Sequence, residues 1–374
     1  MRKRNRTIWL QRSLPLLACF GFVRQAGAGA HSFTWNVDAN GSWDTASNWT
    51  PHGVPGGNSG DTVTFDGAIT ADRTITLGAE QAKAVTFDST HAYTLTGSSL
   101  ALGNGDVNTI LTQSGSGAVN MNVPVILNAG NDGSTFTGSG SGTVTFNNRI
   151  SGDGPLTVSG SHITTFASGN SFTGGLTVDG ATLQLTAAGS ASSGDVVVQN
   201  GGTLLLGGSS STTSRLGSSV NLTLSGSTLN TAGMSENIGK LTLLCDSSSI
   251  NLGSGSSVLK FADSHSVSWS SGSTLTIYNW SGSTHGGGSD QLYFGTTTSG
   301  LTSAQLGEIV FSNPAGFALA GNYPAAILAD GEIVPVPEPA TYVAAGCLLA
   351  LAVYRERKTI LDFVGRARGR SQIS

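Results

Sequence analysis

The feature that most constrains the fold of this chain is a short apolar pattern that recurs about every 20 residues, within the range of repeat lengths typical of solenoids. The pattern occurs at Leu156–Val158, at Leu176–Val178 and again, after the same interval, at Val196–Val198. Alternate residues in each segment are apolar, which is typical of a β-strand with one buried face. A second apolar series, Ile163, Leu183 and Leu204, lies between these segments at nearly the same interval. Each period therefore predicts two short strands separated by a turn.

The repeat also predicts how the strands assemble. A unit of about 20 residues cannot bury its own apolar face, whereas stacking successive units creates a continuous core. Composition suits such a stack, because the chain is 38% hydrophobic, 11% charged and contains 53 glycines. Similar short segments with alternating apolar residues, separated by turn residues, occur at Val63–Phe65, Val85–Phe87, Val144–Phe146, Leu222–Leu224, Leu241–Leu243 and Leu275–Ile277. We predict an all-β fold in which β-solenoid repeats occupy residues 71–277.

Residues 154–206, and Asn170–Val178 in particular, resemble the autotransporter-associated β-strand repeat. Members of that family form right-handed parallel β-helices on bacterial surfaces. The resemblance implies that this solenoid is a right-handed parallel β-helix displayed outside the cell. Of the three cysteines, only Cys245 belongs to the body, so we expect stability to come from strand stacking and not from disulfides.

Aromatic residues gather at both ends of the predicted solenoid. Residues 31–70 contain Trp35, Trp43 and Trp49, and we expect this segment to form an N-terminal cap over the exposed end of the stack. Residues 278–334 are expected to form a C-terminal cap module. Its aromatic residues include Trp280, Tyr293, Phe294, Phe311 and Phe317. One short helix is expected over residues 301–309.

The three N-terminal tryptophans also have an alternative role. Indole rings can stack on sugar rings, and polar partners for sugar hydroxyls lie nearby at Asp38, Asp44 and Asn48. Large aromatic side chains are more often buried in a core. Trp35, Trp43 and Trp49 are therefore candidate glycan contacts of a carbohydrate-binding surface module, weighed against the expectation that they pack inside the cap.

Residues 1–30 have the features of a secretory signal peptide. Basic residues at the start are followed by an apolar run from Leu14 to Val23 and by the small residues Ala26–Ala30, which fit a signal peptidase site. We expect export by the general secretory machinery and cleavage by signal peptidase.

Residues 335–374 carry a second address. Pro337, Glu338 and Pro339 precede an apolar run from Thr341 to Tyr354, and a basic cluster follows at Arg355, Arg357 and Lys358. This order resembles the PEP-CTERM sorting signal of Gram-negative bacteria, and the segment 275–295 resembles a terminal module common in proteins with that tail. The resemblance implies that Pro337, Glu338 and Pro339 are recognised by an exosortase, a membrane-embedded cysteine transpeptidase.

The tail also implies a stay in the membrane. The family's tail is a membrane helix that holds the protein in the inner membrane until processing, and the basic cluster orients it by the positive-inside rule. The apolar run is about 15 residues, shorter than the roughly 20 that cross a bilayer comfortably. The sequence also continues past Lys358 to Ser374, whereas the family usually stops at the basic cluster. An ordinary C-terminal anchor is therefore the alternative.

The body offers few residues for catalysis or cofactor binding. Its histidines do not lie at metal-ligand spacing from one another, and its acids are scattered singly at Asp153, Asp179, Asp195, Asp246 and Asp263. We expect no catalytic residues, no metal and no cofactor, although parallel β-helices can be polysaccharide lyases or hydrolases. A net charge of −4 gives no footprint for nucleic acid.

These features predict a structural or adhesive protein that is not an enzyme. After an inner-membrane intermediate, we expect it on the cell-envelope surface or outside the cell, with extracellular polysaccharide as a candidate partner. A carbohydrate-binding module is the main alternative, and a polysaccharide lyase or hydrolase is a weaker one.

Overall fold

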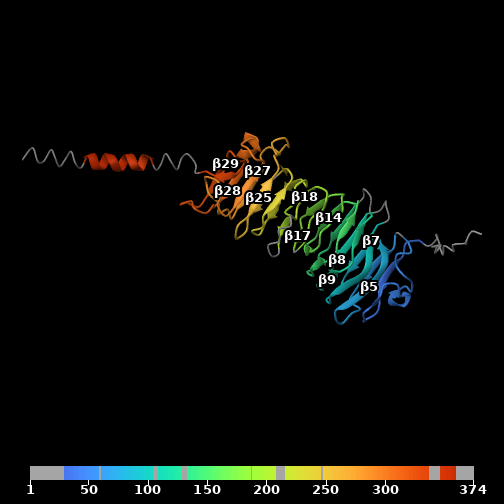
Figure 1. The fold of residues 1–374 in the computed structure, drawn as a ribbon. Coiled ribbons are helices and arrows are strands. Elements are labelled where there is room, and N and C mark those ends of the chain that lie inside the picture. The colour runs from blue at the N-terminus through green and yellow to red at the C-terminus, as the bar shows by residue number, and fades with distance from the viewer. Residues whose placement is uncertain are drawn as a thin grey trace, which may run out of the picture.

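The computed structural model describes residues 29–58, 60–103, 108–128, 133–186, 188–207, 215–245, 247–336 and 346–358. Strands stack one behind another along an elongated body, from the N-terminal strands, blue in Figure 1, to the C-terminal strands, orange. The fold is all-β, and nearly all neighbouring strands run parallel. Two predicted addresses, residues 1–28 of the signal peptide and the Pro-Glu-Pro motif, lie outside the described residues.

Sheet A is an 11-stranded sheet that takes roughly one strand from each successive turn of the chain. Its strands, in spatial order, are β3 (Trp49–Thr50), β1 (Ser32–Trp35), β4 (Thr62–Phe65), β6 (Ala84–Phe87), β8 (Thr109–Gln113), β11 (Ser134–Thr137), β14 (Leu156–Ser159), β16 (Leu176–Asp179), β18 (Val196–Gln199), β20 (Leu222–Ser225) and β23 (Leu241–Leu243). From β1 through β23, apart from β3, each strand pairs in parallel with the next.

Sheet B is a 16-stranded sheet built from the strands that alternate with those of sheet A. It contains β2 (Gly41–Ser42), β5 (Arg73–Ala82), β7 (Tyr93–Leu102), β9 (Val119–Met121), β10 (Val125–Leu127), β12 (Val144–Phe146), β13 (Ile150–Gly152), β15 (Ile163–Phe166), β17 (Thr182–Leu185), β19 (Thr203–Leu206), β21 (Thr228–Asn230), β24 (Ser247–Asn251), β26 (Thr274–Tyr278), β28 (Ile309–Ser312), β29 (Asn322–Ile327) and β30 (Ile333–Pro335). This alternation of parallel strands between long sheets is the arrangement expected of a solenoid.

Some turns of the chain add a third strand, where two per period were expected. Near the N-terminus, the long strand β7 pairs with β9 through its first half and with β10 through its second half. Near the C-terminus, β22 (Glu236–Ile238), β25 (Val258–Phe261) and β27 (Gln291–Phe294) form a separate parallel sheet, sheet C. These strands alternate buried and outward residues like the others, so they close a third side of the core.

Equivalent core residues in sheet A lie side by side. Val158 pairs with Val178 and Val178 with Val198, so the predicted period is the step between parallel neighbours. Beyond these strands the step varies, since Val198 pairs with Leu224 across a longer interval and Leu224 with Leu243 across a shorter one. All five side chains are completely buried. These core residues therefore form a continuous apolar row, and turns of unequal length lie outside it.

The second predicted series is wrong at its first member. Ile163 faces outward and is 43% exposed, whereas Thr164 pairs with Leu183 and is fully buried. The turn before this strand is longer than the turn before Leu183, and it contains the buried His162. Thr164 Oγ1 and His162 Nε2 lie 3.3 Å apart, so the two polar groups partner each other inside the core.

Among the described strands, antiparallel pairing is confined to the two ends of the stack. At the N-terminal end β3 runs antiparallel to β1, and at the C-terminal end β28, β29 and β30 form an antiparallel meander. The chain reverses at these points, where another parallel turn would extend the stack. A reversed strand occupies hydrogen-bonding groups that an open sheet edge would otherwise present.

Helices are few and short. η1 (Ala46–Asn48) is a 3-10 turn, and α1 (Ser303–Gly307) lies within the segment where a short helix is expected. Thr302 caps α1 through a reciprocal capping box with Gln305. A further helix covers residues 346–358, drawn in red in Figure 1. Within the described ranges, no helix is both long and apolar enough to cross a membrane, so the membrane helix expected in the tail is not found there.

Candidate functional site

The N-terminal tryptophans form a closed aromatic cluster. Trp35, Trp43 and Trp49 each have no exposed surface. Trp49 lies 5.1 Å from both of the other rings, centroid to centroid, and all three rings pack within 6.0 Å of Phe65. A sugar ring cannot stack on an indole that has no accessible face. The hypothesis that these tryptophans are glycan contacts is therefore wrong, because the strands at the N-terminal end of the stack enclose them.

Hydrogen bonds within the cluster also argue against a role of these tryptophans in ligand binding. The indole N–H of Trp35 donates to Val37 O at 2.7 Å, that of Trp43 to Pro55 O at 3.2 Å and that of Trp49 to Trp43 O at 2.7 Å. All three polar tips are satisfied by backbone carbonyls, as buried indoles require. The cluster thus has neither an open face nor an available donor for a ligand.

Asp38, a second candidate sugar contact, is also engaged within the chain. Its carboxylate accepts hydrogen bonds from Thr70 Oγ1 at 2.6 Å and from Arg73 Nη2 at 2.6 Å. These bonds, led by that of Thr70, lower the pKa of Asp38 to about 2. Asp38 therefore ties the N-terminal segment to the start of β5 as a charged carboxylate.

The outward side of sheet A is a regular surface that carries two parallel columns of mostly hydroxylated side chains. The first column contains Ser32, Thr62, Ala84, Ile110, Thr135, Thr157, Thr177, Val197, Thr223 and Thr242. The second contains Thr34, Thr64, Thr86, Thr112, Thr137, Ser159, Asp179, Gln199 and Ser225. Neighbouring members of a column are separated by the strand spacing of about 4.8 Å. We call this surface the hydroxyl face.

The hydroxyl face carries little charge and little reactive chemistry. Asp179 is the one ionisable residue in its two columns, and Asn200 Nδ2 donates to it at 2.6 Å. Thr62 Oγ1 donates to Ser32 Oγ at 3.0 Å, so hydroxyls also bond along a column. Such a face suits passive contact with uncharged polar material, since it neither attracts ions nor provides a nucleophile with a base.

The acids of the body remain dispersed. Asp195 accepts from the backbone and side chain of Asn221, and Asp263 pairs with His265 in the same turn. Within the part of the chain that the structure describes, no group of three or more His, Cys, Asp and Glu side chains could hold a metal ion. The absence of catalysis stays a prediction.

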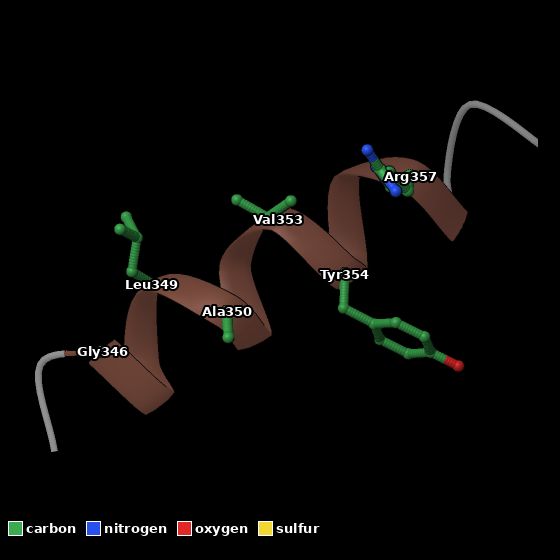
Figure 2. Close-up of a pocket in the computed structure, with 6 residues that line it drawn as sticks. All are labelled: Gly346, Leu349, Ala350, Val353, Tyr354 and Arg357. Atoms are coloured by element: carbon green, nitrogen blue, oxygen red, sulfur yellow. The ribbon is translucent and has the colours of Figure 1, made fainter. Parts of the chain in front are cut away.

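The sorting motif, Pro337, Glu338 and Pro339, falls outside the described residues, while the basic cluster lies on the helix 346–358. Arg355, Arg357 and Lys358 are exposed at its C-terminal end. The turns before them carry exposed apolar side chains, at Leu348, Leu349, Leu351, Val353 and Tyr354. Figure 2 shows Leu349 and Val353 projecting from one side of this helix and Tyr354 from the other. Within the described residues, this helix therefore combines exposed apolar side chains with a basic C-terminal end.

A pocket of about 270 Å³ lies between α1 and the segment 263–270. It is lined by His265, Val267, Ser268, Trp269, Thr302, Ala304, Gln305 and Glu308. Sequence reasoning missed it, because His265 has no second histidine at metal-ligand spacing and Trp269 lies outside the two aromatic ends. The available signal was a tryptophan in an otherwise small and polar segment, Ser266–Ser273.

Comparisons of the chain with protein-family models, with curated proteins and with solved structures find no match. A function for this chain is therefore inferred from the strand stack, the tail and the pocket.

Proposed function

We propose that the chain is an exported structural or adhesive β-solenoid protein of the bacterial cell surface or extracellular matrix. The observation that carries this proposal is the hydroxyl face, two outward columns of mostly Ser and Thr on an unbroken stack of parallel strands. A stack with a continuous core is a stiff scaffold, and its hydroxyl face presents mostly Ser and Thr side chains along its length. Its role is passive: it spaces, supports or adheres, and it does not transform a substrate.

We also propose that the strand stack is right-handed. Parallel strands joined within one layered structure are connected almost always in the right-handed sense, because strands twist to the right. The resemblance of residues 154–206 to a family of right-handed parallel β-helices supports the same hand. We therefore assign a right-handed parallel β-helix with aromatic-rich ends.

The proposed location follows from the two addresses. Signal peptidase removes residues 1–30 during passage through the general secretory machinery. An exosortase-type enzyme then recognises Pro337, Glu338 and Pro339 while the tail is held at the inner membrane. The exposed apolar surface of the helix 346–358 and its basic end support such a membrane intermediate. The released protein ends on the cell surface or in the surrounding polysaccharide.

Cell fractionation combined with intact-mass measurement of the native protein tests this proposal. The wild-type chain is expected to start near residue 29 or 31 and to end near Pro337, whereas Glu338→Ala is expected to remain in the inner membrane with its C-terminus uncut. Glu356→Gln is the matched control, because it removes a carboxylate from the same tail outside the motif and should be processed normally. An uncut C-terminus in all three proteins would make the tail a plain anchor. A full-length cytoplasmic chain would refute export altogether.

A further inference from the structure

We infer that the pocket between α1 and residues 263–270 binds a single neutral sugar residue, through its aromatic wall and its hydrogen-bond acceptors. This inference goes beyond the proposed structural role and does not depend on sorting, since it concerns a binding site formed within the body of the protein. The site differs from the buried N-terminal tryptophan cluster both in position and in accessibility.

The first wall of the pocket is formed where sheet A stops. Beyond β23 the chain does not add another strand, and residues 263–270 bond to its free edge instead. Ser264 Oγ accepts from Leu241 N at 3.0 Å, and Ser270 N donates to Leu243 O at 2.9 Å. Trp269 Nε1 donates to Leu241 O at 2.9 Å, which fixes the orientation of its ring. Trp269 is only partly buried, so part of the ring borders the pocket.

The second wall is α1, which is joined to the first by one buried side chain. Gln305 is 4% exposed, and its Nε2 donates to Ser264 O at 3.0 Å and to Val267 O at 2.9 Å. Its Oε1 accepts from Thr302 N at 2.7 Å within the capping box. Both walls are therefore held together without a ligand, and such preorganisation lowers the entropy lost on binding.

The polar groups at the pocket are rich in acceptors. His265 Nδ1 lies 2.6 Å from Asp263 Oδ1, and this hydrogen bond is the main cause that lowers the pKa of Asp263. In the tautomer whose Nδ1–H donates to that carboxylate, Nε2 is the acceptor nitrogen of the ring. Glu308 adds a carboxylate whose Oε2 accepts only a long bond, 3.2 Å, from Ser273 Oγ. A complementary ligand must bring several donors.

Size and charge narrow the ligand further. A volume of about 270 Å³ lies just below the roughly 300–1,000 Å³ typical of small-molecule pockets, so the site holds one ring and not an oligosaccharide. The carboxylate of Glu308 opposes acidic sugars and phosphates. A neutral pyranose combines hydroxyl donors for His265 and Glu308 with an apolar ring face for Trp269, which is the combination that these walls require.

The test uses the full chain purified from whole cells, so it does not require processing or release. The protein is titrated with glucose, galactose, mannose and N-acetylglucosamine, and binding is measured by saturation-transfer NMR and calorimetry. At least one of these sugars is expected to bind with a dissociation constant of about 1 mM, as suits one ring in a shallow site. Glu308→Gln is expected to weaken binding about tenfold or more, because a hydrogen bond to a charged acceptor is lost. Glucuronate is expected to bind more weakly than the neutral sugar.

Two further variants separate binding from folding. Ala304 lies on the exposed side of α1 and lines the pocket, so Ala304→Phe is expected to block binding while the thermal midpoint stays unchanged. Asp179→Asn, on the hydroxyl face, is the control and should bind as the wild type does. Undiminished binding by Ala304→Phe, or no saturation by any neutral sugar at tens of millimolar, would overturn the inference. Saturable binding of choline without that of neutral sugars would make the site a cation site and would overturn it equally.

Discussion

The N-terminal end of the stack is closed by a cluster of three tryptophans, whereas the C-terminal end, here called the polar end, combines buried aromatic rings with several buried polar side chains. Trp35, Trp43 and Trp49 surround Phe65 and leave no exposed surface. At the other end the polar side chains of Asp290, Glu332 and Gln305 are buried, with exposed fractions of 2%, 0% and 4%. Both ends bury aromatic rings, and the N-terminal end also buries the carboxylate of Asp61, so the ends differ in the proportion of polar side chains that they bury.

The difference follows from what each end must hold. The N-terminal end packs three indole rings against Phe65 of β4, and burial of apolar area needs little directional bonding. The C-terminal end joins loops that cross the stack, so Asp290 links Ser257 to Ser281, and Glu332 links Gly287 to Tyr293. Stability at the polar end should fall as the pH rises, because burial raises the pKa of Glu332, whereas the contribution of Asp38 at the N-terminal end is lost only at low pH, because its pKa is lowered to about 2. The loops of the polar end also leave space for a pocket.

Truncating the aromatic end should have the largest effect. Trp49→Ala is expected to reduce the free energy of unfolding by about 3–5 kcal/mol, because a completely buried indole is replaced by a cavity. Urea denaturation followed by circular dichroism measures the change. Thr157→Val on the hydroxyl face is the control, with an expected change below about 0.5 kcal/mol. A loss of less than about 1 kcal/mol for Trp49→Ala, well under the usual range for such truncations, would show that the cluster does not close the stack.

Removing a carboxylate from the polar end should rank second. Asp290 accepts from Ser257 N at 3.0 Å, from Ser281 N at 2.8 Å and from Ser281 Oγ at 2.6 Å. Asp290→Ala leaves these donors without a partner, so a loss of about 3 kcal/mol is expected. Hydrogen exchange should locate the increased opening in residues 257–294. If protection were instead lost at the N-terminal end, the two ends would not be independent.

A matched pair of tryptophan substitutions sharpens the comparison. Trp49 Nε1 donates to Trp43 O, whereas the buried Trp280 Nε1 has no hydrogen-bond partner among the described residues. Replacement by Phe removes a satisfied donor in Trp49→Phe and an unsatisfied one in Trp280→Phe. We expect Trp49→Phe to be the more destabilising by about 1–2 kcal/mol. Equal losses in chemical denaturation would contradict the assignment of partners.

The smallest expected effect is the pH dependence of the polar end. Burial raises the pKa of Glu332 above its usual value near 4.5, because the charged carboxylate is desolvated, and the negative charge of Asp330 adds to the increase. A carboxyl whose folded pKa is raised stabilises the fold below its unfolded pKa, and this contribution is lost as the pH rises through the folded pKa. Stability measured from the usual glutamate pKa up to slightly alkaline pH should therefore decline less in Glu332→Gln than in the wild type. Identical slopes would mean that Glu332 does not titrate differently in the folded state.

How far the sequence predicts the fold depends on the length of the turns. The strands at Leu156–Val158, Leu176–Val178 and Val196–Val198 were predictable because successive repeats have the same total length, so core residues recur at a constant interval. Elsewhere the intervals between paired core residues are unequal and hide the same stacking. Ile163 was misplaced because a longer turn moved Thr164 into the core, where His162 partners its hydroxyl. Because Thr164 is polar, a search for recurring apolar residues does not identify it as a core position.

The candidate sites were less predictable than the strands. Aromatic residues at the ends were visible in the sequence, but burial of Trp35, Trp43 and Trp49 depends on how the N-terminal strands fold over them. The pocket brings His265 and Trp269 next to Glu308, from a later part of the chain, through the buried side chain of Gln305. Such a junction arises only from tertiary contacts, so no local motif predicts it.

Accessibility of Cys245 on living cells tests the central claim of surface display most directly. Cys245 and Cys347 are free and exposed, and Cys19 lies in the predicted signal peptide. In a Cys347→Ser background, Cys245 is thus the one thiol of the processed body. A maleimide coupled to a polymer too large to cross the outer membrane is expected to label Cys245 on intact cells or on protein released into the medium. Labelling that appears only after the cells are lysed would contradict the proposal that this solenoid is a surface protein.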